Sequence, residues 1–367
     1  MQRLIDLFQQ LVTIDSPSLE ERKMCDFLTG RLRDLGFETY EDNAGELLGG
    51  NSGNLLGTHK GDGKRSSILL SAHMDTVQPG NDKRAVFAEE DKIVSEGETI
   101  LGADDLSGIA AILEAITRLQ EQNIPFRPVE VLFPVAEESY CLGSRVFDYE
   151  RVQSREAYTF DLTGAIGTAA LAAPTLLSFV IHVTGKASHA GFAPLEGCSA
   201  VKAAALAIAK LPIGEPQPGL TLNVGRVEGG GATNIVPPLC KFTGEIRSLS
   251  HEAVMKLWDE VQQICTAEII GYGAHIEISF EIEVTAYETD KHDKVVTRFV
   301  QACEELELTP SLTTTLGGSD QNNFALHGIT GIVCASSMYE VHSTREYTRP
   351  SEMEQCVNII MKLLTSD

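Results

Sequence analysis

"SSILLSAHMD", residues 66–75, is an apolar run that ends in a histidine and an aspartate. A continuous apolar run of this length is typical of a strand buried on both faces of a sheet. Residues two apart in a strand point to the same face, so His73 and Asp75 are expected to share one site. There, an imidazole can bind a metal ion while the neighbouring carboxylate fixes its orientation. The alternative interpretation is a strand end with two solvated polar residues.

Helical and strand patterns alternate on both sides of this run. Up to residue 161, the periodicity predicts helices at 4–12, 18–37 and 107–122, and buried strands at 66–75, 128–138 and 157–161. Ser18 and Glu21 are expected to form a capping box for the second helix, and Gly36 to end it. Strands that alternate with helices indicate an α/β fold, here a mixed, mostly parallel sheet with helices on both faces.

The pattern changes near residue 172 and returns near 287. The order between these points is strand, helix, strand, strand, helix, strand, which indicates an inserted α+β domain of the ferredoxin-like type. A helix near 292–306 and a strand at 331–337 then resume the α/β pattern. We therefore predict a discontinuous catalytic domain, 1–171 and 287–367, and a lid and dimerisation domain, 172–286.

Composition excludes several classes of partner. The formal net charge of −23 argues against binding to nucleic acid or to an anionic membrane surface. No apolar run has the length of a membrane span, and the first residues read as a helix rather than a secretory signal. The eight cysteines are scattered without a CxxC pair, which favours reduced, buried thiols in a cytoplasmic protein.

Acidic or histidine residues also follow other predicted strands. They are Asp104 and Asp105, Glu137 and Glu138, Asp161, and His342. Each has a structural alternative: a helix cap, a solvated turn, an Asx-turn or a hydrogen-bonded loop histidine. Ligands of open α/β sheets bind at the carboxyl ends of the strands, and the combination matches a binuclear site with imidazole and carboxylate ligands. Such ligands favour two divalent ions, with zinc preferred and cobalt or manganese tolerated.

Eight short motifs follow one another in a recognisable order. They are "AHMDT", "GADDLSG", "AEES", "FDLTG", "GKASHAG", "GGGATNIVPP", "GGSDQNNF" and "VHSTRE". In this order the chain resembles the M20 family of di-zinc metallopeptidases, and its peptidase T-like, tripeptide aminopeptidase branch in particular. The resemblance runs over nearly the whole chain and includes a lid inserted between two halves of a catalytic domain.

The resemblance implies which residues hold the metal ions. His73, Asp104 and Asp161 correspond to the ligands of the first ion. Asp104, Glu138 and His342 correspond to those of the second, so that Asp104 bridges the two. The resemblance also implies that Asp104 is joined to its neighbour Asp105 by a cis peptide bond.

The same resemblance implies the catalytic and substrate-binding residues. Glu137 corresponds to the general base and Asp75 to the carboxylate that holds the histidine of the first metal. In the lid, His189 corresponds to the histidine that polarises the scissile carbonyl, often from a partner subunit. Asn234 and Arg247 correspond to residues that hold the substrate backbone and its carboxylate. The reaction implied is hydrolysis of the N-terminal peptide bond of short peptides by a hydroxide that bridges the two metals.

The chain departs from the family pattern at positions that affect the choice of substrate. Leu106 stands where the family usually has lysine, and "EESYCLGS" replaces a glycine-rich turn after the glutamates. "DLTG" and "GSDQNN" replace glycine-rich sequences of peptidase T. The alternatives are therefore an M20-type deacylase or carboxypeptidase acting on N-acyl amino acids, and a non-catalytic metal-binding protein. An aspartate at Asp161, rather than a glutamate, goes with aminopeptidases and dipeptidases in the family.

Two further expectations concern partners. The strand at 176–186 and the helix after it offer an apolar edge and face, so a homodimer through the lid domain is expected. A buried substrate ammonium needs an acidic partner, and Asp320 and Glu346 are the candidates, with helix capping as the alternative for Asp320.

Overall fold

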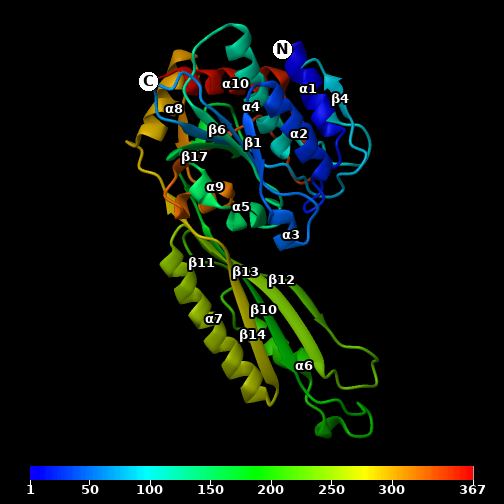
Figure 1. Cartoon of the computed structure of the whole chain (residues 1–367). Helices are drawn as coiled ribbons and strands as arrows, with labels where there is room; N and C mark the ends of the chain where they lie inside the picture. The colour runs from blue at the N-terminus through cyan, green and yellow to red at the C-terminus, as the bar shows by residue number, and fades with distance from the viewer. Residues whose placement is uncertain (367) are drawn as a thin grey trace. The chain divides into compact units, whose positions relative to one another are not determined.

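The computed structural model describes residues 1–366, and the chain divides into two compact units. The first unit comprises Met1–Ala173 and Glu288–Asp367, and the second comprises Pro174–Tyr287. These boundaries lie within two residues of the predicted ones. Each unit is described by itself below, with its elements labelled as in Figure 1.

The first unit is built on an eight-stranded sheet. Its strands, in the order in which they lie across the sheet, are β1 (Glu38–Glu41), β2 (Leu55–His59), β6 (Val129–Phe133), β3 (Ile68–Ser71), β7 (Glu156–Leu162), β17 (Thr330–Ala335), β8 (Thr168–Ala170) and β16 (Ser311–Thr313). The four central strands, from β6 to β17, run parallel, while β1 and β2 add an antiparallel edge. The prediction of a mixed, mostly parallel sheet is confirmed.

Helices cover both faces of this sheet because its central strands are apolar on both sides. The helices of the first unit are α1 (Gln2–Val12), α2 (Arg22–Asp34), α3 (Ala44–Leu48), α4 (Ala103–Glu121), α5 (Leu142–Val146), α8 (Lys294–Glu305), α9 (Asp320–Leu326) and α10 (Pro350–Thr365). In β3, Ile68 and Leu70 join the large core that contains α1, α4 and α10. The residue between them, Leu69, faces a smaller core with Phe324 of α9. The continuous apolar run of β3 is thus buried on alternate sides.

Smaller elements complete the first unit. A separate three-stranded sheet consists of β4 (Ala85–Glu89), β5 (Lys92–Ser95) and β18 (Tyr347–Thr348). Short strands β9 (Ala172–Ala173) and β15 (Tyr287–Glu288) lie in the sequence at the boundaries between the units. Within residues 1–366, no helix has both the length and the apolar character needed to cross a membrane.

The second unit has the predicted ferredoxin-like order. Its elements are β10 (Thr175–Thr184), α6 (Ala200–Ile208), β11 (Gly214–Gln217), β12 (Leu220–Gly229), β13 (Leu239–Ser248), α7 (His251–Tyr272) and β14 (His275–Val284). The sheet is antiparallel in the order β11-β12-β13-β10-β14. Residues of α6 and α7, including Trp258, pack on one face of it to form a separate core. The prediction of β10 as an apolar edge is wrong, since β10 pairs with a neighbour on both sides.

Two local predictions also need correction. Strand β3 ends at Ser71, so His73 and Asp75 lie in the loop after it rather than on one strand face, as was predicted. Ser18 and Glu21 do not form a capping box for α2. The Ser18 hydroxyl donates instead to Asp75, at 2.6 Å, and Glu21 accepts from backbone amides outside the helix. Both side chains satisfy polar groups of a buried loop, which a short capping pattern does not reveal.

Candidate active site

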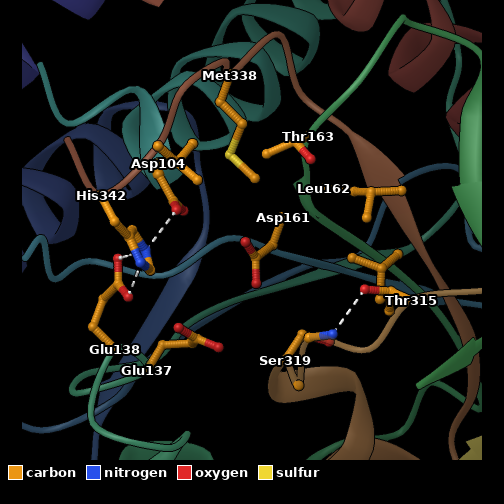
Figure 2. Close-up of a pocket in the computed structure, with 14 residues that line it drawn as sticks. Asp104, Glu137, Glu138, Asp161, Leu162, Thr163, Thr315, Ser319, Met338 and His342 are labelled. Atoms are coloured by element: carbon orange, nitrogen blue, oxygen red, sulfur yellow. Dashed lines mark hydrogen bonds and ion pairs between the residues drawn. The ribbon is translucent and has the colours of Figure 1, made fainter. Parts of the chain in front are cut away.

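Four parallel strand ends bring most of the predicted site residues of the first unit together. His73 follows β3, Glu137 and Glu138 follow β6, and Asp161 lies near the end of β7. The loop after β17 brings in His342, and the start of α4 brings in Asp104. Figure 2 shows the side chains of Asp104, Asp161, both glutamates and His342 around one pocket. Because parallel strands all end at the same edge, segments far apart in the sequence meet there.

Asp104 lies between the two histidines. Its Oδ1 is 3.1 Å from His73 Nε2, and its Oδ2 is 3.2 Å from His342 Nε2. Each carboxylate oxygen therefore faces a different imidazole. The peptide bond between Asp104 and Asp105 is cis, as the resemblance implies.

The remaining acidic side chains gather on either side of this bridge. The carboxylate oxygens of Glu138 lie 3.0 and 3.1 Å from His342 Nε2. Asp161 Oδ1 and Glu137 Oε2 lie 4.0 and 3.9 Å from His73 Nε2. Two overlapping sets of side chains, which share His73, have ligand atoms close enough to hold an ion: His73–Asp104–Glu138 and His73–Glu137–Asp161.

Asp75 organises the site without lining the pocket. Its carboxylate accepts hydrogen bonds from the amides of Glu137, at 2.9 Å, and Glu138, at 3.1 Å, as well as from the Ser18 hydroxyl. His73 Nδ1 lies 2.9 Å from the backbone carbonyl oxygen of Asp75 and 3.4 Å from its carboxylate. Donation from Nδ1 leaves Nε2 as the nitrogen that faces the site, which is the tautomer a metal ligand needs.

Burial and mutual repulsion set the charge state of these groups. Burial, together with the charge of Asp161, raises the pKa of Glu137 well above its usual range. Burial and the charge of Asp104 do the same to Asp161. Hydrogen bonds to Asp104 and Glu138 raise the pKa of His342 to about 11. Carboxylates that lie this close together stay ionised only when cations lie beside them. Here the two protonated imidazoles are those cations.

The side chains present fit two divalent ions. Crowded buried carboxylates need positive charge, and ions would supply it in place of the protons on the imidazoles. Two nitrogen ligands and several carboxylate oxygens, one carboxylate shared by both histidines, form a donor set that suits zinc and tolerates manganese or cobalt.

The pocket has a polar floor and a partly apolar wall. Its acidic side is formed by the candidate metal-binding carboxylates and Glu137. The lining also includes the apolar side chains of Leu162, Val333, Met338 and Val341. Figure 2 shows Leu162 and Met338 among the residues that surround the pocket. A glycine-containing loop at 315–319 completes the lining. A small peptide could therefore place an apolar side chain beside the acidic floor.

Comparisons with known proteins agree with this geometry. Residues 54–196 match the model of peptidase family M28, and residues 171–272 match the peptidase dimerisation domain of M20 proteins. The chain is similar over 99% of its length to the crystal structure of aminopeptidase PepT from Bacillus cereus, with 35% identity, 98% of that chain covered and a TM-score of 0.91. The chain belongs to the M20 peptidase family. The predicted family and a peptide hydrolase of this type are thereby confirmed.

Two further proteins to which the chain is similar are named for different activities. A tripeptidase from Staphylococcus aureus is 28% identical, with 99% of this chain and 97% of that chain covered and a TM-score of 0.95. Carboxypeptidase G2 from Pseudomonas is 30% identical over 272 residues, which are 71% of this chain and 64% of that protein. Similarity therefore extends to proteins that are named for different peptidase activities, which bears on the choice of substrate below.

The three site residues that were predicted in the lid, His189, Asn234 and Arg247, lie in the second unit. His189 and Ile235 form a bridge, so His189 lies beside Asn234. His189 Nδ1 accepts from the amides of Gly191 and Phe192, at 3.1 and 3.2 Å, which leaves its Nε2 as the donor of a neutral ring.

Arg247 does not lie beside that histidine within the second unit. It pairs with Leu176, at the start of β10, whereas the loop of His189 follows the other end of that strand. The Arg247 guanidinium also contacts Glu245 at 2.8 and 3.0 Å. A substrate carboxylate bound by Arg247 would have to share the guanidinium with Glu245.

The structure corrects the two candidates for amine recognition. Glu346 is buried and accepts hydrogen bonds from the amides of Leu101, Gly102 and Asp104. Asp320 is also buried, accepts from the Ser144 hydroxyl at 2.5 Å, and follows the actual helix cap, Ser319. Neither side chain is among those that line the pocket, so neither is placed for a substrate ammonium.

The contacts of several supporting residues were not predicted from the sequence. Cys141 donates to Glu137 Oε1 at 3.2 Å, and Leu106, noted as a departure from the family pattern, is fully buried in the main core. The role of Ser18 was hidden because it lies 57 positions from Asp75 in the sequence. No local pattern marks such pairs, since only the fold brings them together.

Proposed function

We propose that this protein is a two-metal aminopeptidase that removes the N-terminal residue of short peptides. The observation that carries this proposal is the position of Asp104, with one oxygen toward each of His73 and His342. A carboxylate that faces two imidazoles can be shared by two ions, and a pair of ions can catalyse hydrolysis. Similarity along the whole chain to an aminopeptidase PepT and to a tripeptidase supports the choice of substrate.

The proposed first ion is held by His73, Asp104 and Asp161, and the second by Asp104, Glu138 and His342. When bound, the two ions would polarise the scissile carbonyl and make a water molecule more acidic. Three carboxylates would offset most of the charge of two divalent ions. Zinc is the proposed metal, because imidazole and carboxylate ligands suit it, with cobalt or manganese as substitutes.

Glu137 is proposed as the general base. It lies beside the ligands but farther from His73 Nε2 than Asp104 does, at 3.9 Å against 3.1 Å. Its carboxylate would take a proton from the attacking water and pass it to the leaving amine. Asp75 would hold the backbone of Glu137 and Glu138 through its two amide hydrogen bonds.

The second unit is proposed to complete the site in a homodimer. His189 Nε2–H would donate to the oxyanion of the tetrahedral intermediate, and Asn234 and Arg247 would hold the substrate backbone and carboxylate. The match of residues 171–272 to a peptidase dimerisation domain supports the dimer. Exposed apolar residues of this unit, Phe192, Leu195 and Leu206, offer surface for such an interface.

The second candidate function is hydrolysis of N-acyl amino acids. Similarity to carboxypeptidase G2 favours it, whereas aspartate at Asp161 and the similarity to PepT favour the aminopeptidase. A non-catalytic metal-binding protein is the third alternative, and any peptide turnover by the zinc-loaded protein excludes it.

The deciding experiment compares one tripeptide with its N-acetylated form. An aminopeptidase must recognise the free ammonium, and loss of a charged hydrogen bond costs about 1.5–3 kcal/mol. Acetylation is therefore expected to lower kcat/KM by roughly tenfold or more, since 1.36 kcal/mol corresponds to a factor of ten. Equal or faster cleavage of the acetylated peptide would overturn the aminopeptidase proposal and support the deacylase. Acetyl amino acids of matched side chain serve as the positive control for that outcome.

A further inference from the structure

Glu346 connects two loops that carry proposed metal ligands. Its Oε2 accepts from the amides of Leu101, at 2.8 Å, and Gly102, at 2.7 Å, and its Oε1 accepts from the amide of Asp104 at 3.0 Å. The side chain is 1% exposed. Among residues 1–366, no lysine or arginine forms an ion pair with it, and its carboxylate oxygens accept from three backbone amides.

These hydrogen bonds hold the turn that leads into α4. The residue at the helix N-cap is Gly102, which has no side chain to accept a hydrogen bond and adopts φ +78°. Asp104 and Asp105 have non-helical dihedral angles, so Glu346 holds an irregular segment ahead of the regular part of α4. Glu346 supplies its acceptor oxygens from a segment more than 240 positions away in the sequence.

The same residue fixes the loop of His342. Glu346 lies four positions after His342, and its amide donates to the carbonyl of Ser343 at 3.1 Å, which closes a tight turn. The next residues, Tyr347–Thr348, form β18 and pair with β5. One end of Glu346 is thus anchored in the His342 loop, and the other end holds the irregular segment that carries Asp104.

We propose that Glu346 is a positioning residue for the second metal ion, setting the separation between Asp104 and His342. This inference rests on the proposed metal-ligand assignment. Removal of a group that orients a ligand typically lowers metal affinity about 10- to 100-fold. The first ion shares only Asp104 with this arrangement, so its affinity should change less.

The test uses E346Q in the full-length protein, with E340Q as the matched control. Glutamine keeps the shape of Glu346 but turns one acceptor oxygen into an amide donor that faces backbone N–H groups. Glu340 lies in the same loop, exposed and paired with Arg345 at 2.7 Å, so its substitution should leave metal binding unchanged. Zinc content is measured by elemental analysis after equilibration with a graded chelator series, and unfolding of the metal-free proteins is followed by circular dichroism.

The expected result for E346Q is loss of one of two zinc equivalents at chelator strengths where wild type and E340Q keep both. Its affinity for the second ion should fall about 10- to 100-fold, and added metal should restore peptide turnover. Unchanged affinity for both ions would overturn the proposal. If the variant also melts at a lower temperature, Glu346 has a purely structural role. If E346Q does not fold, E346D carries the same test, because it keeps the charge and shortens the reach.

A double-mutant cycle separates this inference from the proposed function. The effect of E346Q on the second ion should disappear in an H342A background, where that ion has already lost a ligand. A persistent effect would show that Glu346 does not act through this site. Absence of peptide turnover in wild type would refute the aminopeptidase but leave these metal measurements interpretable.

Discussion

At the scale of single residues, the two adjacent glutamates are proposed to differ in role because they have different neighbours. Glu138 contacts His342 through both oxygens, whereas Glu137 accepts from the Cys141 thiol and lies 3.9 Å from the nearer imidazole nitrogen. A ligand needs the first arrangement. A base that must exchange a proton needs the second, with one oxygen left for water.

Substitution of each glutamate should separate these roles. E137Q keeps the shape of the side chain but removes the base, so turnover of a tripeptide should fall by roughly 10²–10⁴-fold with two metal equivalents retained. E138Q should lose metal as well as activity. Steady-state kinetics and elemental analysis of the same preparations measure both effects. Near-normal turnover by E137Q would show that the base and ligand have been assigned wrongly.

Glu21 provides a pH-dependent prediction outside the metal ligands. Burial, together with the charge of Asp75, raises the pKa of Glu21 to about 7, and one of its oxygens has no hydrogen-bond partner. The folded protein therefore binds this proton more tightly than the unfolded chain. Stability attributable to Glu21 is present below its unfolded pKa and is lost as the pH rises toward 7.

E21Q cannot ionise and should escape that loss. The free energy of unfolding of E21Q, relative to wild type, should rise with pH between about 4.5 and 7, by at most about 3 kcal/mol at 1.36 kcal/mol per pKa unit. Urea unfolding of the metal-free proteins at several pH values measures the difference. E20Q, which changes an exposed neighbour, should show no such trend. A flat difference for E21Q would contradict the raised pKa.

At the scale of elements, close packing of α4 on β7 places Asp104 near Asp161. Gly108 of α4 allows this approach, because a Cβ atom there would lie 2.6 Å from both the carbonyl oxygen of Phe160 and a carboxylate oxygen of Asp105. Phe160 precedes Asp161 in the strand, and Asp105 follows Asp104. A side chain at position 108 would therefore displace the neighbours of two proposed ligands.

The element prediction is that G108A lowers both stability and metal affinity. In an open helix the same change stabilises by up to about 1 kcal/mol, because alanine favours helix more than glycine does. G30A in α2 is the matched control, since nothing lies within 4 Å of its new methyl group, and it should raise the melting temperature. Thermal melts with and without zinc measure both variants. If G108A is as stable as G30A, then α4 can move away from β7 at little cost in free energy, which would contradict the prediction.

Elements were predictable from the sequence where periodicity was strong. The strand predicted at 176–186 and the helix predicted at 4–12 match the observed β10 and α1 to within two residues at each end. Positions in the loops after strands were predictable only through their chemical types, because His73 and Asp75 lie beyond the strand that was expected to align them. The role of Glu346 was missed, since its partners lie more than 240 positions away and only the fold reveals them.

At the scale of the whole molecule, the fold divides the proposed function between two units. The first unit brings the proposed metal ligands and base together without help from the second. The proposed carbonyl-polarising residue, His189, lies in the second unit, in a segment matched by a peptidase dimerisation domain. In the proposed mechanism, an active site is completed by a second unit from the same chain or from a partner chain. Mixing two inactive variants distinguishes these two cases.

Complementation between two inactive variants decides whether His189 acts on its own chain or on its partner. H189A lacks the proposed oxyanion donor and E137Q lacks the base, so each homodimer should be nearly inactive. In a heterodimer with His189 acting across the interface, one site would combine Glu137 of one chain with His189 of the other. Random pairing gives half heterodimers, so about a quarter of wild-type turnover per site should return.

The mixed proteins must be shown to exchange subunits, for which differently tagged chains and sequential affinity purification suffice. Purified heterodimer should then have about half of the wild-type turnover, because one of its two sites is complete. If His189 acts within its own chain, every site in the heterodimer lacks either the base or the donor, and no activity returns. A H189A homodimer with wild-type kcat would instead remove His189 from the mechanism altogether. Recovery in the heterodimer alone therefore requires a dimer in which each active site is completed by its partner.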